Sequence, residues 1–448
     1  MMNYLTIIGL FTGLCWSWQV QACHTPERAA KLTQARGDAQ FLKAAHAMRQ
    51  TQKIAYRLLA PSSCNNGFAD IFPCKNITLL AHLDLDEIGG TAGTTGNDSW
   101  GWKDASENRY YALIGRSNGT AFVDISDPAN PSYQANLPSQ SGTSDWRDIK
   151  TYLDHAFIVA DDVTGHGMQV FDLKRLRNSN SAPATFAADA VYDQFDEAHN
   201  IAINTDSGYA YAVGSNTCNG GLHMIDIRDP VKPSFAGCYS SDGYTHDVQC
   251  INYNGPDSDY QGQEICFASN EDTLTIIDVT EKSSPQQLSR TGYGAHYSHQ
   301  GWLTSDRRYF LMDDELDEYQ NGGNTRTLVW DVSDLDQPVM VGTHLGSGSS
   351  IDHNQYIIGN YSYQANYSRG LRVLHLDNLA SAQLTEVAYM DSYPEADGHR
   401  NWNGAWNVYP FFDNGLVLIS DINRGLFIVR PQLPILFDGF ETDSTTLE

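Results

Sequence analysis

A six-residue phrase recurs along almost the whole length of this sequence. Its clearest copy, GLHMID, ends at Asp226 and is followed seven residues later by Pro233. Successive copies lie 44 to 55 residues apart, and their sixth residues are Asp124, Asp172, Asp226, Asp278, Asp331, His375 and Arg430. Each unit contains short apolar runs separated by turns, with no helical pattern between copies, as expected for β-strands. A period of about 50 residues in short strands predicts the blades of a β-propeller.

Seven copies predict an all-β, seven-bladed propeller over residues 61–431. The last copy, Gly425 to Arg430, is not followed by an apolar segment that could serve as the fourth strand of its blade. The segment Ile77 to Leu83 resembles the segments that follow the phrase elsewhere. We therefore expect this N-terminal strand to complete the last blade, which would close the ring and remove the exposed edges of an open sheet.

The N-terminal residues carry targeting signals. Residues 1–22 resemble a signal peptide, because Leu5 to Val20 is almost entirely apolar and is followed by the small residue Ala22. Residues 23–60 begin with Thr25 and Pro26, a typical helix start, and have apolar residues at helical spacing. We expect a short helical spacer there, and a C-terminal tail at residues 432–448.

Six cysteines form three close pairs, Cys64/Cys74, Cys218/Cys238 and Cys250/Cys266. We expect three disulfides, which are typical of exported proteins; a metal site is the alternative, although no C-x-x-C pair is present. Cys23 follows the expected cleavage point and has no neighbour, so either lipid attachment or ordinary cleavage is expected there. The expected location is the periplasm, the outer membrane or the cell exterior, with membrane contact only through a lipid anchor.

The net charge also restricts the partners. The chain has 54 acidic and 28 basic residues, which disfavours nucleic acid as a partner. An acidic surface favours cations or a basic partner, and it also occurs simply as a solvated surface.

The middle repeats open with a histidine and a polar residue. If these pairs begin the innermost strands, the imidazoles converge on the mouth of the central channel. The histidines are His199, His246, His299 and His353. Imidazole together with carboxylate suits a divalent transition metal such as zinc, manganese, iron or nickel. Alternatively, each histidine caps its own blade through hydrogen bonds.

Polar residues next to these histidines are candidate ligand contacts. They are Asp148, Asn200, Asp247, Gln300 and Asn354. The motif Trp146-Arg147-Asp148 and the segment 399–402 (HRNW) take corresponding places in two further repeats. A polar ligand would then be surrounded by carboxamides and carboxylates from several blades.

An acidic run provides a second candidate metal site. Asp313, Asp314 and Asp317 belong to a stretch with five acidic residues in six, which would repel one another unless solvated or bound to cations. Calcium is the usual cation outside the cell. The run lacks the spacing of an EF-hand, so a solvated loop is the alternative.

One apparent catalytic motif does not have the required context. Residues Gly115 to Gly119 (GRSNG) match the G-x-S-x-G pattern of a nucleophile elbow. That motif needs a strand, a sharp turn and a helix, whereas here the turn leads into another strand. We therefore expect a hairpin.

Long stretches of the chain resemble the choice-of-anchor B family of bacterial exported proteins, and the phrase resembles the LVIVD repeat. The resemblance extends from about Cys64 to Pro431. It is carried by residues 245–280 (THDVQCINYNGPDSDYQGQEICFASNEDTLTIIDVT), 298–318 (SHQGWLTSDRRYFLMDDELDE) and 351–374 (IDHNQYIIGNYSYQANYSRGLRVL). It implies a shared repeat domain whose attachment varies between a lipoprotein signal and a C-terminal sorting signal. Because the tail from Leu436 to Glu441 is followed by no apolar segment or basic stop, attachment is expected to depend on Cys23. The resemblance implies no reaction.

These observations lead to two functional hypotheses. The first is a monomeric, non-enzymatic module that binds a protein or polysaccharide partner at the cell surface or in the periplasm. It rests on the rigid propeller and on the lack of an H-E-x-x-H motif or a phosphate loop. The second is a metal-dependent enzyme in which the histidine ring supplies three ligands and an open position activates water. The sequence assigns no catalytic residue, and a divalent metal, either calcium or a transition metal, is the expected cofactor.

Overall fold

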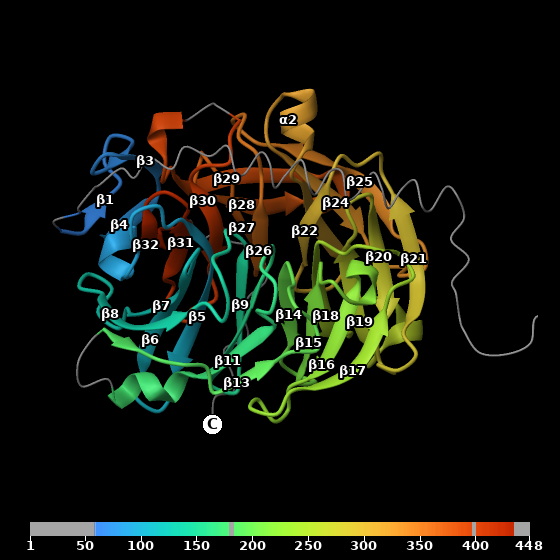
Figure 1. The fold of residues 1–448 in the computed structure, drawn as a ribbon. Helices are drawn as coiled ribbons and strands as arrows, with labels where there is room; N and C mark the ends of the chain where they lie inside the picture. Colours follow the sequence, from blue (N-terminus) through green and yellow to red (C-terminus); the bar gives the residue numbers. More distant parts are fainter. Residues whose placement is uncertain (1–57, 59, 179–182, 397–399, 434–448) are drawn as a thin grey trace, which may run out of the picture.

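Seven antiparallel sheets form a ring, as the seven copies of the phrase predict (Figure 1). The computed structural model describes residues 58, 60–178, 183–396 and 400–433. The innermost strand of each sheet contacts the innermost strand of the next all the way round. The chain is therefore an all-β, seven-bladed propeller. The expected signal peptide, Cys23 and nearly all of the helical spacer and C-terminal tail lie outside the described residues.

Blades 1 to 3 carry the first three copies of the phrase on their third strands. Blade 1 contains β5 (Gly96–Asp104), β6 (Arg109–Arg116), β7 (Gly119–Asp124) and β8 (Ser132–Pro138), with β12 (Ala184–Thr185) parallel to β8. Blade 2 contains β9 (Arg147–Tyr152), β10 (His155–Ala160), β11 (Met168–Asp172) and β13 (Ala190–Tyr192). Blade 3 contains β14 (Asn200–Asn204), β15 (Tyr209–Val213), β16 (Leu222–Asp226) and β17 (Ser234–Tyr239).

Blades 4 to 6 repeat this order. Blade 4 contains β18 (Asp247–Asn252), β19 (Glu264–Ser269), β20 (Thr273–Asp278) and β21 (Gln286–Gly292). Blade 5 contains β22 (Ser298–Leu303), β23 (Tyr309–Asp314), β24 (Arg326–Asp331) and β25 (Val339–Leu345). Blade 6 contains β26 (Asn354–Ile358), β27 (Tyr361–Ala365), β28 (Leu371–Asn378) and β29 (Gln383–Met390).

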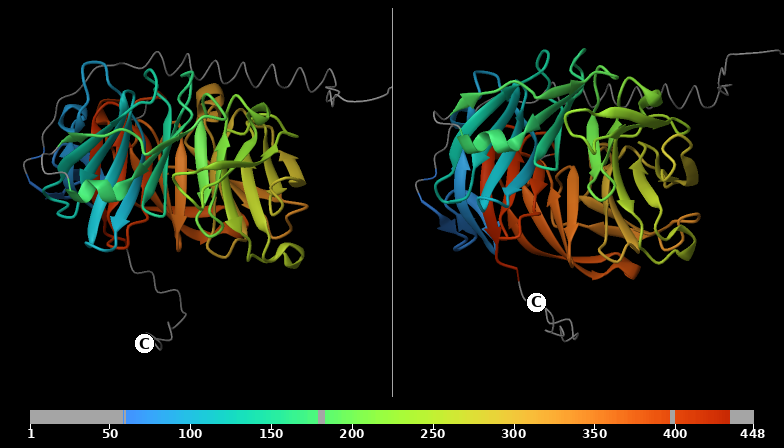
Figure 2. Two further views of the ribbon diagram at one scale, coloured as in Figure 1. Left: turned by 60° about the horizontal axis from the view of Figure 1, so that its bottom comes forward. Right: turned by 90° about the horizontal axis from the view of Figure 1, so that it is seen from below.

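Blade 7 combines the two ends of the described chain. It contains β30 (Ala405–Tyr409), β31 (Val417–Asp421) and β32 (Gly425–Pro431), and β4 (Ile77–Leu83) pairs antiparallel with β32. Figures 1 and 2 show the blue strand β4 beside the red C-terminal strands. β4 thus occupies the position of the missing fourth strand.

The segment before β4 spans two blades. β1 (Ser62–Ser63) pairs with β4 in blade 7, whereas β3 (Phe72–Lys75), which follows β2 (Phe68–Ala69), pairs with β29 in blade 6. The disulfide between Cys64 and Cys74 joins these two edges. The N-terminal segment therefore links blades 6 and 7.

Helical elements are few and short in the described part of the chain. They are α2 (Asp317–Asn321) and the 3₁₀ turns η1 (Leu85–Ile88), η2 (Leu173–Asn178), η3 (Cys218–Gly220), η4 (Ser258–Tyr260), η5 (Leu379–Ser381) and η6 (Pro394–Ala396). No helix among the described residues is long and apolar enough to cross a membrane.

The sixth residue of the phrase has a clear structural role. In five blades it is an aspartate at the end of the third strand, and its carboxylate accepts a hydrogen bond from the backbone N–H two residues later, as between Asp226 Oδ1 and Arg228 N at 3.0 Å. This bond stabilises the turn out of the strand. In four blades the conserved spacing then places a proline, such as Pro233, directly before the outermost strand, where a missing backbone donor is tolerated.

All three expected disulfides are present: Cys64–Cys74, Cys218–Cys238 and Cys250–Cys266. The last pair is cross-strand, because Cys250 in β18 lies opposite Cys266 in β19. Three disulfides indicate that the protein matures outside the reducing cytosol and is exported.

The G-x-S-x-G segment forms a hairpin, as predicted. Its two central residues, Ser117 and Asn118, connect β6 to β7, and the paired strands continue on both sides. Gly115 is needed because a Cβ there would lie 2.1 Å from Asn97 Oδ1. A nucleophile elbow is therefore not formed.

Candidate metal centre at the channel mouth

Four histidines meet where the innermost strands begin. His199, His246, His299 and His353 lie at or just before the first residues of β14, β18, β22 and β26. The centroids of successive rings are 4.4, 4.0 and 4.4 Å apart. Since the four strands belong to adjacent blades, the equivalent positions form one continuous arc of imidazoles.

Hydrogen bonds orient these rings. The Nδ1 of His246 lies 3.0 Å from the backbone oxygen of His299, and the Nδ1 of His353 lies 2.5 Å from that of Trp406. A carbonyl oxygen only accepts hydrogen bonds, so Nδ1 carries the hydrogen and the neutral ring keeps its lone pair on Nε2. His199 is held in a similar way by Asp161, with Nδ1 and Oδ2 2.9 Å apart.

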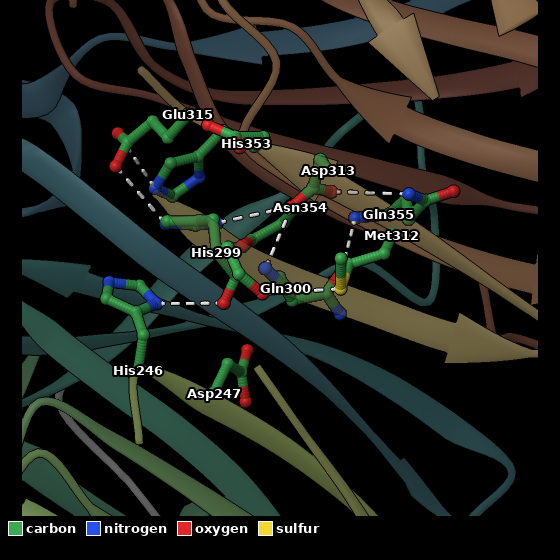
Figure 3. A network of polar contacts seen from close by, with 12 residues as sticks. His246, Asp247, His299, Gln300, Met312, Asp313, Glu315, His353, Asn354 and Gln355 are labelled. Atoms are coloured by element: carbon green, nitrogen blue, oxygen red, sulfur yellow. Dashed lines mark hydrogen bonds and ion pairs between the residues drawn. The ribbon is translucent and has the colours of Figure 1, made fainter. Parts of the chain in front are cut away.

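Glu315 completes a compact donor group with two of the histidines (Figure 3). Its Oε2 lies 3.5 Å from His299 Nε2, and its Oε1 lies 4.0 Å from His353 Nε2. All three ligand atoms lie within 4.8 Å of one another. Among the residues that the structure describes, this is the group of three or more metal-ligating side chains close enough to hold one ion.

The group has dimensions and partners that suit a metal. Zinc bonds to imidazole nitrogen at about 2.0–2.1 Å, so its donors lie on the order of 3.5 Å apart and only a small contraction is needed. Glu315 accepts a hydrogen bond from Tyr367 Oη at 2.6 Å, and His353 donates its other N–H to a carbonyl. Such outer hydrogen bonds typically orient metal ligands.

Burial favours the neutral imidazole at His246 and His299. It lowers the pKa of His246 well below the ordinary value, and the neighbouring His299, His199 and His353 lower it further. Burial also lowers the pKa of His299, although Glu315 opposes the shift. Neutral imidazole is the form that binds metal ions.

Blades 2 and 7 have other residues at the position that the histidines occupy in blades 3 to 6. Arg147 begins β9 and donates to the backbone oxygen of Arg116 and to His166 Nε2. In blade 7 the position belongs to Trp406, whose carbonyl receives the bond from His353. The expectation that residues 399–402 take this place is therefore wrong. The spacing of 53 or 54 residues between successive positions in blades 4 to 6 identifies Trp406, whereas residues 400–402, the described part of the HRNW segment, lie in the preceding loop.

The polar residues next to the histidines mainly join neighbouring blades. Asp148 Oδ2 accepts from Ile201 N at 2.7 Å, and Gln300 Oε1 accepts from Gln355 N at 3.0 Å. Asn200 donates to the backbone oxygen of His246 at 2.9 Å, and Asn354 donates to Asn407 at 3.4 Å. Asp247 instead accepts from the adjacent Val248 N. Four of the five residues predicted to contact a ligand thus link neighbouring blades and form a second ring of contacts below the histidines, and Asp247 and Gln300 also border a cavity.

A buried ion cluster stabilises this second ring. Lys150 pairs with Asp148 and lies 3.6 Å from Asp98. Burial raises the pKa of Asp98 well above its ordinary value. Against the effect of burial, Lys150 holds the pKa of Asp148 below its ordinary value. Lys150 and Asp148 therefore form a buried ion pair within this cluster.

The acidic run is buried, so the solvated-loop interpretation is wrong. Asp313, Asp314 and Asp317 are each 2% exposed. Each carboxylate has different partners: Asp313 accepts from Gln300 N, Asp314 from His296 N and Tyr297 N, and Asp317 pairs with Arg326. Burial raises the pKa of all three, which reduces their mutual repulsion. Two residues of the run face His299, because Asp313 Oδ1 lies 3.5 Å from its Nδ1 and Glu315 Oε2 lies 3.5 Å from its Nε2, and Glu315 also reaches His353.

Residues 105–137 and 262–290 match the LVIVD repeat. No curated protein sequence matches the chain. Among solved structures, similar chains include hydrazine synthase from Kuenenia stuttgartiensis (11% identity, 72% of this chain and 93% of that one, TM-score 0.49) and the propeller domain of Cps50 (Swd1) from Myceliophteria thermophila (10%, 75% and 99%, 0.48). A third is the periplasmic gluconolactonase of Pseudomonas aeruginosa (11%, 66% and 85%, 0.47). Similarities of this size carry no argument about activity or ligands.

Proposed function

The chain is an LVIVD-repeat β-propeller, and we propose that it acts as an exported binding protein that holds one divalent transition-metal ion at the histidine end of its channel. His299, Glu315 and His353 would supply two nitrogens and one oxygen, a donor set that suits zinc. Because His299 and Glu315 belong to blade 5 and His353 to blade 6, the ion would tie two blades together.

The convergence of three pre-oriented ligands carries this proposal. Glu315 lies within 4.0 Å of both histidine Nε2 atoms, and Tyr367 Oη donates a hydrogen bond to its Oε1. If His299 and His353 only capped their blades through hydrogen bonds, no buried glutamate would be needed next to their Nε2 atoms. Burying a carboxylate without a compensating charge is costly.

Burial favours a binding role over an enzymatic one. His299, Glu315 and His353 are 2%, 1% and 3% exposed, so little room is left for a substrate at the ion. Apolar and aromatic side chains that include Tyr367 and Trp406 pack together on the same side. Structural metal sites are closed, whereas catalytic sites keep an open position.

A metal-dependent enzyme is the second candidate, because two histidines and one glutamate also form catalytic zinc sites that retain a water. Cobalt(II) substitution separates the two. If the visible spectrum of the cobalt protein is unchanged by azide, the site is closed and the binding role is supported. An azide-dependent change would indicate an open coordination position and favour the enzyme.

Metal content tests the proposal itself. The full mature chain is stripped with a chelator, titrated with zinc, and its bound metal is measured by mass spectrometry. We expect one zinc per chain, lost in His353→Ala and in Glu315→Gln. His344→Gln, in the outer strand β25, is the matched control and should keep the ion. A wild-type chain that takes up no zinc, manganese, iron or nickel would refute the proposal, as would unchanged binding in both ligand variants.

Attachment to the cell envelope is a further part of the proposal. The sequence context of Cys23 supports diacylation, and two acyl chains suffice for stable anchoring where one does not. Mass spectrometry of the mature N-terminus should then find a modified Cys23, and Cys23→Ala should release the protein into the soluble fraction. An unmodified N-terminus at Cys23 or His24 would instead indicate a periplasmic or secreted protein. In either location, the partner would be a protein or a polysaccharide met outside the cytosol.

A further inference from the structure

The end of the channel opposite the histidines contains a cavity of about 310 Å³. Its walls follow the innermost strands of six blades, from Asp247 to Asn252 in β18 and on to Thr205 beyond the end of β14. The histidines precede these strands, so the cavity and the metal centre lie at opposite ends of the same channel. Its volume lies at the small end of the range of about 300–1,000 Å³ for ligand pockets.

One wall of the cavity is aromatic. Trp100, Trp302 and Tyr356 come from blades 1, 5 and 6. The rings of Trp302 and Tyr356 are 5.0 Å apart, those of Trp100 and Tyr356 are 5.9 Å apart, and Phe411 packs behind them. Both tryptophans are partly exposed. They therefore offer flat apolar surface that the core does not cover.

The facing wall is polar. Lys150 lies 4.6 Å from the centre of the Trp100 ring, and Asn204 donates to Asn252 at 3.0 Å. Gln249 accepts from Leu303 N through Oε1, which leaves its amide N–H groups for a ligand. These groups can donate to and accept from hydroxyls along one edge of a bound molecule.

The charges of the cavity balance. Lys150 pairs with Asp148, and the charged side chains that line the cavity are two basic residues, Lys150 and Arg307, and two acidic residues, Asp206 and Asp247. A strongly charged ligand would therefore gain no net attraction. A neutral ligand with one apolar face and several hydroxyls would use both walls.

We infer that this cavity binds a neutral saccharide, as a monosaccharide or disaccharide or as the end of a longer glycan. The apolar C–H face of a sugar ring stacks on aromatic side chains, and its hydroxyls need amide partners such as Gln249 and Asn252, the latter held in place by Asn204. The inference identifies the ligand class of the binding protein proposed above, but it uses none of the metal ligands.

A sugar titration tests this inference on the full mature chain. Tryptophan fluorescence and calorimetry follow the addition of glucose, galactose, mannose, N-acetylglucosamine, maltose and cellobiose, with glucuronic acid and glucosamine as charged analogues. We expect saturable binding of at least one neutral sugar. Trp302→Ala should weaken it about tenfold or more, as for other buried aromatic contacts.

Two further variants separate loss of binding from loss of folding. Thr205 is exposed at the rim, so Thr205→Arg should fold normally and weaken binding by obstructing the entrance. Trp402→Phe, among the aromatic residues near the histidines, should bind as wild type does. The inference is overturned if no sugar binds up to about 10 mM, well above a Kd of about 1 mM that corresponds to weak binding. Tighter binding of a charged analogue, or binding unchanged in both cavity variants, would also overturn it.

Metal binding and sugar binding are tested by different variants, so either proposal can fail without the other. His353→Ala should lose the ion and keep its sugar affinity. A protein that binds sugar but no metal would support this inference alone.

Discussion

The two ends of the channel are built from the same seven strands yet have opposite character. At the histidine end, His246, His299 and His353 are almost fully buried, and the rings of His246 and His353 are turned toward backbone carbonyls of the next blade. At the other end, Trp100 and Trp302 are partly exposed around a cavity. The difference shows that one repeat can provide a closed site that holds blades together and an open site that accepts a ligand.

Lys150 belongs to the cavity wall and to the buried ion cluster behind it, so its removal is expected to have the largest effect on stability. Lys150→Met leaves Asp148 buried without its positive partner, and we expect a loss of about 3–5 kcal/mol in the free energy of unfolding. Denaturant unfolding measures it. Lys232→Met, which changes an exposed lysine, is the control and should have no measurable effect. A Lys150→Met protein with the same free energy of unfolding as wild type would show that the ion cluster does not stabilise the propeller.

Zinc should stabilise the histidine end alone. At a free zinc concentration of 100 times Kd, the free energy of unfolding should rise by about 3 kcal/mol, because the ion binds only the folded chain. The increase should be absent in His353→Ala and present in His344→Gln, as measured by denaturant unfolding with and without zinc. Loss of the increase in Trp302→Ala would contradict the independence of the two ends.

A histidine outside the channel, His223, also has a lowered pKa, so it can be compared with the histidines of the metal centre. Burial lowers the pKa of His223 to about 4, while Tyr192 Oη and Thr217 Oγ1 lie 2.8 Å from its two nitrogens. Above pH 6.5 neither the folded nor the unfolded form is protonated at this site. Below pH 6.5 the imidazole becomes protonated in the unfolded chain but stays neutral in the folded chain. The free energy of unfolding therefore falls between about pH 6.5 and pH 4.

The loss attributable to His223 over that range should be about 2–3 kcal/mol. It is measured as the difference in pH dependence between wild type and His223→Gln, which keeps hydrogen-bonding capacity. We expect a flatter profile for the variant and equal zinc binding in both proteins. If the free energy of unfolding of wild type and of His223→Gln changed equally with pH, the pKa of His223 would not be lowered in the folded chain.

The smallest effect on stability is expected at the rim of the cavity. Thr205→Arg changes an exposed residue, so the free energy of unfolding should stay within about 0.5 kcal/mol of wild type. Metal content should also be unchanged. A large loss of stability would mean that the rim contributes to the propeller itself and is not only an entrance.

Much of the fold follows from local patterns in the sequence. The aspartate that ends the phrase stabilises the following turn by accepting a hydrogen bond from the backbone N–H two residues later. The repeat is therefore easy to recognise in the sequence wherever that aspartate occurs. The disulfide pairs are likewise close in sequence. The same spacing aligns the four histidines, since equivalent repeat positions occupy equivalent places around a ring.

The candidate site could be predicted only in part. Glu315 lies within an acidic run in which several carboxylates are chemically alike, and their partners belong to different elements. Which carboxylate faces the imidazoles depends on the path of the chain after β23. The place of Trp406 in blade 7 was obscured because the HRNW segment has more of the expected residue types, but its described residues, 400–402, lie in a loop.

The sequence by itself determined the number of blades, the turns between their strands and the cysteine pairs, because each depends on residues that are near one another or repeated at a fixed spacing. Only the tertiary structure decided which side chains meet across blades. His299, Glu315 and His353, like Trp100, Trp302 and Tyr356, come together because the ring brings distant strand ends to one axis. Their contacts depend on side-chain direction and burial, which a repeat pattern does not encode.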